Sequence, residues 1–250
     1  MTDRIVQDKG GWVMKPMFSY FGSKYRLAAK YGAPRHDTVI EAFAGSAAYS
    51  LFWEPKNVLL VDKNPIIISI WDYLIGASEK DVLQLPLKFN HIDDLDCEEG
   101  AKNLIGFWIG KGKTTPAKSK SKWGRQYENS GDCKVWGEKV KERIVSQLPK
   151  IKHWKTLCAD YTKIPNKAAH WFIDPPYQVV GTAYPFKDID YSDLAEWVRV
   201  RRGFVQACEN TGATYLPFKK FRTIHTYHHM TKDGKRKAKY TEEVLYEQGK

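Results

Sequence analysis

The amino-acid sequence predicts an α/β protein with a mostly parallel seven-stranded sheet, helices on both faces and a terminal antiparallel hairpin. Short apolar runs that end in an acid or a turn alternate with segments of helical periodicity, the pattern of parallel strands joined by helices. Near the C-terminus, two segments with strand-like alternation flank Asp233-Gly234. Asp-Gly between two strand runs is a strong turn signal, which predicts the hairpin.

The first predicted strand leads into a turn of small residues. Val39 and Ile40 form a buried run. Glu41 to Ser46 form the turn, and helical character begins at Ala47. A strand, a small-residue turn and a helix N-terminus together make a ligand cradle. The turn lacks the three glycines of the dinucleotide fingerprint, and the carboxylate of Glu41 suits a cationic or amine-bearing ligand.

The second predicted strand, residues 57–62, also ends in a carboxylate. Asp62 follows the first turn by about 20 residues, where nucleoside-binding α/β folds place an acceptor for ribose hydroxyl groups. Pro65 then opens a helix with Asn64 as its N-cap. The alternative interpretation of Asp62 is a solvent-facing side chain at a strand end.

A strand over residues 170–174 carries the most informative motif. It ends in Asp174, Pro175, Pro176 and Tyr177. The prolines cannot donate to a ladder, so the strand must stop there, and they fix the direction of the flanking side chains. A rigid acceptor beside an exposed aromatic ring suits a planar group with an amino donor, such as a nucleobase extruded from a duplex. The alternative is an ordinary strand end whose aromatic ring packs on the body.

The remaining elements are predicted from periodicity and alternation. They are helices over residues 66–74, 136–148 and 190–201, and strands over residues 156–161, 204–208, 222–227 and 240–246.

The composition indicates an anionic partner. The chain has 40 Lys and Arg against 29 Asp and Glu, a net charge of +11, and nucleic acid is the commonest partner of such a chain. The longest apolar run, residues 65–76, contains Ser69 and Asp72 and is too short to span a bilayer. We therefore expect no membrane partner, and the sequence identifies no protein partner.

The cysteines and acids indicate neither disulfides nor a metal site. No cysteine pair has a metal-ligand spacing, and we interpret all four as reduced thiols in a cytoplasmic protein: Cys97, Cys133, Cys158 and Cys208. Residues 1–15 are polar and predict no signal peptide. The acidic cluster at residues 93–99 lacks a ligand-loop pattern with glycine at its turn, so we expect no metal.

Two basic stretches are candidate nucleic-acid contacts. Glycine, threonine and proline keep the first one irregular, and a flexible basic loop with interleaved aromatic residues suits phosphate contact and base stacking. Its predicted contact residues are Lys111, Lys113, Lys118, Lys120, Lys122, Trp123 and Arg125. The tip of the C-terminal hairpin adds Lys232, Lys235 and Arg236. The alternative for the first stretch is a solvated loop whose aromatic rings pack on the body.

Three motifs, in order, resemble those of the Dam-type (D12 class) family of DNA adenine-N6 methyltransferases. Tyr20-x-Gly22-Ser23-Lys24 is similar to the N-terminal motif of that family. Glu41-Ala42-Phe43-Ala44-Gly45-Ser46 is similar to the cofactor loop of the family, with Ser46 where the family usually carries glycine. Asp174-Pro175-Pro176-Tyr177 is similar to the catalytic motif of the family. The resemblance covers roughly residues 16–230 and is greatest to the short phage-borne members.

The resemblance implies a Rossmann-like class I fold and transfer of a methyl group from S-adenosylmethionine to N6 of a flipped adenine in double-stranded DNA, with S-adenosylhomocysteine as product. It implies that the first two motifs, with Asp62, Lys63, Asp160 and Tyr161, hold the cofactor. We expect a cofactor-binding half in residues 1–85, an inserted target-recognition segment in residues 86–155, and a catalytic half with the hairpin in residues 156–250.

In this interpretation Asp174 and the carbonyl of Pro175 accept the hydrogens of the target amine, and Tyr177 stacks on the flipped ring. No cysteine stands beside the prolines, as carbon-5 methylation of a pyrimidine would require. Two alternatives stay open. One is amine methylation of cytosine N4, RNA or a protein amide, although cytosine-N4 enzymes usually have serine in place of Asp174. The other is a catalytically inactive DNA-binding protein on the same scaffold.

Overall fold

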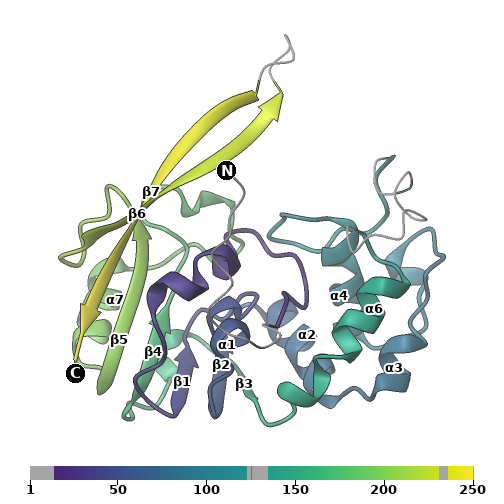
Figure 1. Cartoon of the computed structure of the whole chain (residues 1–250), viewed down its shortest axis with the longest axis horizontal. Coiled ribbons are helices and arrows are strands. Elements are labelled where there is room, and N and C mark those ends of the chain that lie inside the picture. Colours follow the sequence, from purple (N-terminus) through teal and green to yellow (C-terminus); the bar gives the residue numbers. More distant parts are fainter. Residues whose placement is uncertain (1–13, 123–124, 126–134, 231–235, 250) are drawn as a thin grey trace.

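The computed structural model describes residues 14–122, 125, 135–230 and 236–249, with the backbone alone at residues 224–230 and 236–240. Its centre is a seven-stranded sheet in the order β3-β2-β1-β4-β5-β7-β6 (Figure 1). The strands are β1 (Thr38–Glu41), β2 (Asn57–Asp62), β3 (Lys155–Cys158), β4 (Ala169–Ile173), β5 (Gly203–Asn210), β6 (Lys219–Met230) and β7 (Arg236–Gln248).

The first five strands are parallel, and β7 runs antiparallel to both β5 and β6. The predicted α/β fold class, with its terminal antiparallel hairpin, is confirmed. The chain starts at β1, moves outward to β2 and β3, and returns to the other side of β1 at β4. The strand order therefore reverses between β1 and β4, and such a switch point is where open α/β sheets bind ligands.

Six α-helices connect the strands of the described chain. They are α1 (Ala48–Trp53), α2 (Pro65–Gly76), α3 (Glu79–Leu83), α4 (Glu99–Ile109), α6 (Glu138–Val145) and α7 (Tyr191–Arg199). Short 3-10 helices are η1 (Lys24–Arg26), η2 (Ala28–Tyr31), η3 (Ile92–Asp94), η4 (Leu148–Lys150), η5 (Tyr161–Lys163) and η6 (Gly181–Ala183). Among the described residues, no helix has the length and apolar character needed to cross a membrane.

Helix starts follow the capping signals of the sequence. Asn64 accepts a hydrogen bond from Ile66 N–H at 3.0 Å and Pro65 occupies the first helical position of α2, as predicted. Asp190 caps α7 by accepting from the N–H groups of Ser192 and Asp193. Because these caps satisfy the free N–H groups of the first turn, each helix begins at a defined residue.

One predicted strand is shorter in the structure than in the sequence analysis. The strand expected over residues 156–161 ends at Cys158. Asp160 turns the chain because its side chain accepts a hydrogen bond from Thr162 N–H at 3.1 Å and caps η5, which contains Tyr161. This local side-chain bond competes with the ladder and stops the strand.

Helices cover both faces of the sheet. On one face, Ile40 and Trp171 pack in an apolar cluster with residues of α7. On the other face, Val39 and Phe172 pack against Tyr49 of α1, whose ring lies 4.4 Å from that of Phe172. The two faces alternate along β1 and β4 because successive side chains of a strand point in opposite directions.

The described residues between 86 and 155 include α4 and α6 and pack at the β3 end of the sheet (Figure 1). Its side chains share one apolar cluster with β2 and α2, in which Phe107, Trp136 and Trp154 lie with Trp71. Trp136, an aromatic residue that follows the basic stretch in the sequence, is fully buried. Its Nε1 donates to the Pro86 carbonyl at 2.8 Å, so this ring packs on the body of the protein.

Candidate active site

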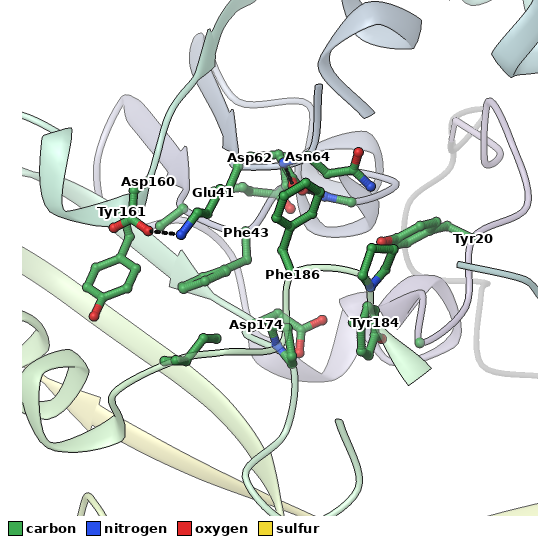
Figure 2. A pocket seen from close by; sticks show the side chains of 18 of the residues that line it. Tyr20, Glu41, Phe43, Asp62, Asn64, Asp160, Tyr161, Asp174, Tyr184 and Phe186 are labelled. Carbon is green, nitrogen blue, oxygen red and sulfur yellow. Dashed lines mark hydrogen bonds and ion pairs between the residues drawn. The ribbon is translucent and has the colours of Figure 1, made fainter. Parts of the chain in front are cut away.

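A cavity of about 250 Å³ opens at the carboxyl ends of β1, β2, β3 and β4 (Figure 2). It lies at the switch point because parallel strands bring their carboxyl ends to the same edge of the sheet. All of the residues predicted to bind the cofactor line it: Tyr20, Gly22, Ser23, Lys24, Glu41, Ala42, Phe43, Ala44, Gly45, Ser46, Asp62, Lys63, Asp160 and Tyr161. Of the predicted catalytic motif, Asp174 and Pro176 line it as well.

Two carboxylates hold the turn between β1 and α1. Glu41 is buried, and its Oε1 accepts from Ser50 N–H at 2.8 Å. Asp62 accepts from Gly45 N–H at 3.0 Å through one oxygen and from Asn64 N–H at 2.9 Å through the other. The sequence predicted carboxylates that face a ligand, and the structure adds that each also fixes the backbone of the cradle.

Burial changes the pKa values of both carboxyl groups. Burial raises the pKa of Glu41 to about 7, although the hydrogen bonds from Ser50 oppose the rise. Burial also raises the pKa of Asp62 to about 6, against two backbone N–H bonds. A cation placed in the cavity would favour the ionised form of both groups.

The far end of the cavity is formed by the chain after β3. Asp160 forms an ion pair with Lys63 at 3.1 Å, drawn as a dashed line in Figure 2. Burial opposes the charge of Asp160, but the bonds from Thr162 and Lys63 hold its pKa below the ordinary value. The hydroxyl of Tyr161 donates to Asp193 at 2.7 Å, and the Tyr161 ring lies 5.6 Å from that of Phe43.

Asp174 stands at the end of β4 and is paired with a lysine. Lys24 Nζ lies 2.9 Å from Asp174 Oδ1, and the same ammonium donates to the Gly22 carbonyl at 3.2 Å. Burial raises the pKa of Asp174 above its ordinary value, while the Lys24 ammonium opposes that rise. For Lys24, burial disfavours the charge, but Asp174 and Glu243 raise its pKa above the ordinary value. The contact is an ion pair, and Asp174 Oδ1 accepts no hydrogen bond from the described residues.

Tyr177 differs from its predicted placement. An exposed ring was expected, but Tyr177 is only partly exposed and is not among the residues that line the cavity. Its hydroxyl donates to Glu243 Oε2 at 2.6 Å, and Lys24 Nζ lies 4.7 Å from its ring centroid. Burial and the carboxylates of Asp174 and Glu243 raise the pKa of Tyr177 well above its ordinary value. The hairpin causes this placement, because β7 pairs with β5 and brings the buried Glu243 beside the motif.

The segment between β4 and α7 also lines the cavity, and no sequence pattern had marked it as part of the site. Tyr184 packs against Tyr20, with ring centroids 6.2 Å apart, and its hydroxyl donates to the Phe21 carbonyl at 3.3 Å. A Cβ on Gly22 would lie 2.2 Å from the Tyr184 hydroxyl, and Gly22 has a φ of +75°, so both the space and the backbone require glycine here. Phe186 lies in the middle of the cavity in Figure 2. The density of aromatic and acidic residues directly after the catalytic motif was the available signal.

The cavity is acidic although the chain is basic. Seven carboxylates line it, against two lysines: Glu41, Asp62, Asp160, Asp174, Asp188, Asp190 and Asp193, with Lys24 and Lys63. Each lysine is paired with one of these carboxylates. The lining therefore favours a small cationic ligand. Within the described residues, no three His, Cys, Asp or Glu side chains converge as a metal site.

Residues 111–121 of the first basic stretch are irregular, as predicted, and their backbone is hydrogen-bonded to the body of the protein. Ile92 N–H of η3 donates to the Lys118 carbonyl at 2.9 Å, and Ala117 N–H donates to the Gly106 carbonyl of α4 at 3.1 Å. Lys118 also pairs with Asp93 at 2.6 Å. The cause is close packing, since a Cβ on Gly106 would lie 2.5 Å from Pro116 Cβ.

Other basic side chains of this stretch also contact the protein itself. Lys120 Nζ donates to the Leu87 carbonyl at 2.8 Å, and Arg125 donates to the Lys120 carbonyl at 2.6 Å. Lys111 Nζ lies 4.8 Å from the Trp108 ring centroid. Lys113 and Lys122 are exposed. The predicted contacts Trp123, Lys232 and Lys235 lie outside the described residues, as does the side chain of Arg236.

The cysteines described by the structure are free thiols. They are Cys97, Cys158 and Cys208, while Cys133 lies outside the described residues.

Comparisons with known proteins add little to this geometry. The sequence matches no family model and no curated protein. Among solved structures, the chain is similar to "Putative methyltransferase yhhF from Escherichia coli", with 8% identity, coverage of 90% of this chain and 81% of that one, and a TM-score of 0.36. A similarity this distant does not carry over the name of that protein, so the functional argument depends on the site.

Proposed function

We propose that the protein is an S-adenosylmethionine-dependent methyltransferase that acts on the N6 amine of adenine in DNA. The observation that carries the proposal is the position of Asp174. It stands on the wall of an acidic cavity whose lining includes every residue that the sequence assigns to the methyl donor. One side chain at this place can face both the donor and an incoming amine.

The lining suits the proposed donor. S-Adenosylmethionine bears a sulfonium and an ammonium group, and an excess of carboxylates stabilises positive charge. Each oxygen of Asp62 accepts one backbone N–H, which leaves lone pairs for ribose hydroxyl groups. Phe43 and Tyr161 provide flat apolar surfaces at the far end, where an adenine ring can pack. When bound, the donor supplies a methyl group made electrophilic by the sulfonium.

The residues of the chain would orient and activate the amine. The exocyclic amine of adenine is a weak nucleophile because its lone pair is shared with the ring. Hydrogen bonds to Asp174 and to the Pro175 carbonyl would draw that lone pair toward the methyl group. Lys24 Nζ lies 2.9 Å from Asp174 Oδ1, and this buried oxygen has no hydrogen-bond partner among the described residues, which supports a role for it as acceptor of the amine. Alignment then supplies much of the barrier reduction.

The same carboxylate can manage the proton. Methylation leaves the amine with a proton to lose, and a carboxylate with a raised pKa is a suitable acceptor. The ammonium of Lys24 must move away from Asp174, or share it, when the amine enters. Proton acceptance by Asp174 and displacement of Lys24 both place the Lys24–Asp174 pair at the centre of the proposed chemistry.

DNA is the favoured substrate because the chain has a net charge of +11 and the cavity does not contribute to that excess. Positive charge elsewhere on the surface would attract a polyanion. The proposed adenine specificity depends on Asp174 in the four-residue motif. Cytosine N4, RNA and protein amides are the other amine substrates that the experiment must separate.

The test is nucleoside mass spectrometry on DNA from cells that express the wild type or Asp174→Ala. We expect N6-methyladenine with the wild type alone, and sequencing of the modified positions then maps the recognition site. Asp37→Ala is the matched control, because Asp37 is an exposed aspartate that pairs with Lys56 at the surface. N4-methylcytosine in place of N6-methyladenine, or no modified nucleoside in the DNA, would refute the assignment.

A further inference from the structure

Two apolar side chains directly after the catalytic motif face solvent. Val179 is 54% exposed and Val180 is 53% exposed. Two more exposed apolar residues, Phe21 and Phe186, line the cavity itself. A single exposed valine needs no explanation, but adjacent apolar residues beside a candidate active site indicate a contact surface.

The segment that carries the two valines is held in place on both sides. Gln178 N–H donates to Glu209 at 2.8 Å, and the Gln178 side chain accepts from Thr214 N–H at 3.0 Å. Gly181 N–H donates to the Tyr177 carbonyl at 2.7 Å. The backbone around Val179 and Val180 is thus fixed, although their side chains are not covered.

Close packing fixes the segment further. A Cβ on Gly181 would lie 2.8 Å from the carbonyl carbon of Pro176, so the turn is pressed against the motif. A Cβ on Gly212 would lie 3.3 Å from Val179 Cγ2, so Val179 rests on the chain that follows β5. A branched side chain on a fixed backbone has little conformational entropy to lose when it binds.

The surroundings of the two valines favour a nucleic-acid partner. The hydroxyl of Thr114 donates to the Ala183 carbonyl at 2.9 Å, which joins this segment to the basic stretch. Lys111 and Lys113 precede Thr114 in that stretch. A small apolar projection linked through Thr114 to a stretch that carries the exposed Lys113 matches the way in which proteins insert apolar side chains between base steps and contact the adjacent phosphates.

We infer that Val179 and Val180 form an apolar wedge that contacts the base stack of duplex DNA where the target base leaves it. This inference depends on the proposed function. Extruding a paired base has an unstacking and unpairing cost of a few kcal/mol, which is lowest for a base that is already unpaired. A side chain that fills the gap lowers this cost. The wedge therefore matters for a paired target and not for an unpaired one.

The experiment compares the double variant Val179→Ser/Val180→Ser with the wild type on two duplexes. Both contain the mapped recognition site, one with the target adenine paired and the other with an abasic position opposite it. We expect kcat/KM to fall at least about tenfold on the paired duplex and to stay within about twofold on the abasic one. Val200→Ser is the matched control, because Val200 is 60% exposed at the end of α7. It should change neither value.

A second readout does not require methyl transfer. With 2-aminopurine in place of the target adenine, the wild type and the control should raise the fluorescence on binding, and the double variant should raise it much less. Equal losses on both duplexes, or no loss on either, would overturn the wedge while leaving the proposed function intact. If the wild type modifies neither duplex and does not raise the fluorescence, the proposed function fails together with the wedge.

Discussion

The cavity and the basic stretch carry opposite charge in one chain. The cavity is lined by seven carboxylates, whereas residues 111–125 are rich in lysine. A charge at a distance attracts a large partner, while a charge inside a cavity selects a small ligand at short range. Under the proposed function, this contrast would separate attraction of a polyanion from binding of a cationic donor.

The two regions also hold their charges in different ways. In the cavity, Glu41 and Asp62 accept hydrogen bonds from backbone N–H groups. These bonds use only some of the lone pairs of each carboxylate, so acceptor capacity remains for a ligand. In the basic stretch, Lys118 and Lys120 donate to an aspartate and a carbonyl of the protein itself. A lysine engaged in this way is less available for a phosphate. The difference can be tested by removing charge from each region in turn.

The largest effect is expected at Asp174. Asp174→Asn should lower kcat at least about a hundredfold, a loss of roughly 3 kcal/mol of transition-state stabilisation, because the amide cannot act as an anionic acceptor. Donor affinity should change little. Single-turnover kinetics and calorimetric titration of the donor on the same preparation check both values. Residual activity above about one per cent would remove Asp174 from the assigned role.

Charge removal at the strand ends should weaken the donor site next. We expect Asp62→Asn and Glu41→Gln each to raise the donor Kd about tenfold, roughly 1.4 kcal/mol, while DNA affinity stays the same. Asp37→Asn is the control at the surface. Thermal unfolding must accompany the titrations, because both side chains also hold the turn. Normal donor binding by both folded variants would show that the carboxylates serve the backbone alone.

Donor binding should depend on pH in the direction set by these carboxyl groups. The pKa of Glu41 is raised from 4.5 to about 7, and that of Asp62 from 3.8 to about 6. A cation binds the ionised forms better, so donor affinity should rise as the pH increases from about 5 to about 7, and binding should release protons. Calorimetry in two buffers with different ionisation enthalpies measures the release. A flat profile and no proton release would contradict the prediction.

The stability of the donor-free protein should show the opposite trend. Because both pKa values are higher in the folded chain than their ordinary values, protonation favours the folded state. The contribution of these groups is fully present below about pH 4 and is lost as the pH rises to about 7. The difference in Tm with and without donor should therefore grow over the same range. A difference that stays constant would show that other groups control it.

A moderate effect on stability is expected where the hairpin meets the catalytic motif. Tyr177→Phe should lower the free energy of unfolding by about 1–3 kcal/mol, because it leaves the buried Glu243 without its 2.6 Å donor. Activity should fall only a few-fold, since stacking requires the ring and not the hydroxyl. A double-mutant cycle with Glu243→Gln isolates the pair. Additive effects on stability would show that the hydrogen bond contributes little.

The smallest effect is expected in the basic stretch. If Lys118, Lys120 and Lys122 all contacted phosphates, their joint replacement would lower the salt slope of DNA binding by about 3. Since two of them are engaged within the protein, we expect a change of about 1, together with a lower Tm from the loss of the Lys120 bond to Leu87. Fluorescence anisotropy over a range of salt concentrations measures the slope. A drop of 3 would show that the lysines exchange their internal partners for DNA.

The positions of the acids could be predicted because they depend on local pattern and on one topological rule. Glu41, Asp62 and Asp174 each end or follow an apolar run, and parallel strands align their carboxyl ends at one edge. The cradle turn and the helix starts are likewise coded locally, as the caps at Asn64 and Asp190 show. The sequence alone therefore determined the fold class and the part of the cavity lining that the strand ends and the cradle turn supply, but not the part supplied by the segment between β4 and α7.

The partners of these side chains were decided only by the tertiary structure. Lys24 meets Asp174 across the sheet edge, and Tyr177 meets Glu243 from a strand 66 residues later in the chain. Periodicity reports which side of an element is buried, but it does not report what a distant element brings to that side. The direction of a side chain beyond a strand end is set by such long-range contacts. For that reason the ring predicted to be exposed at Tyr177 is held by the hairpin.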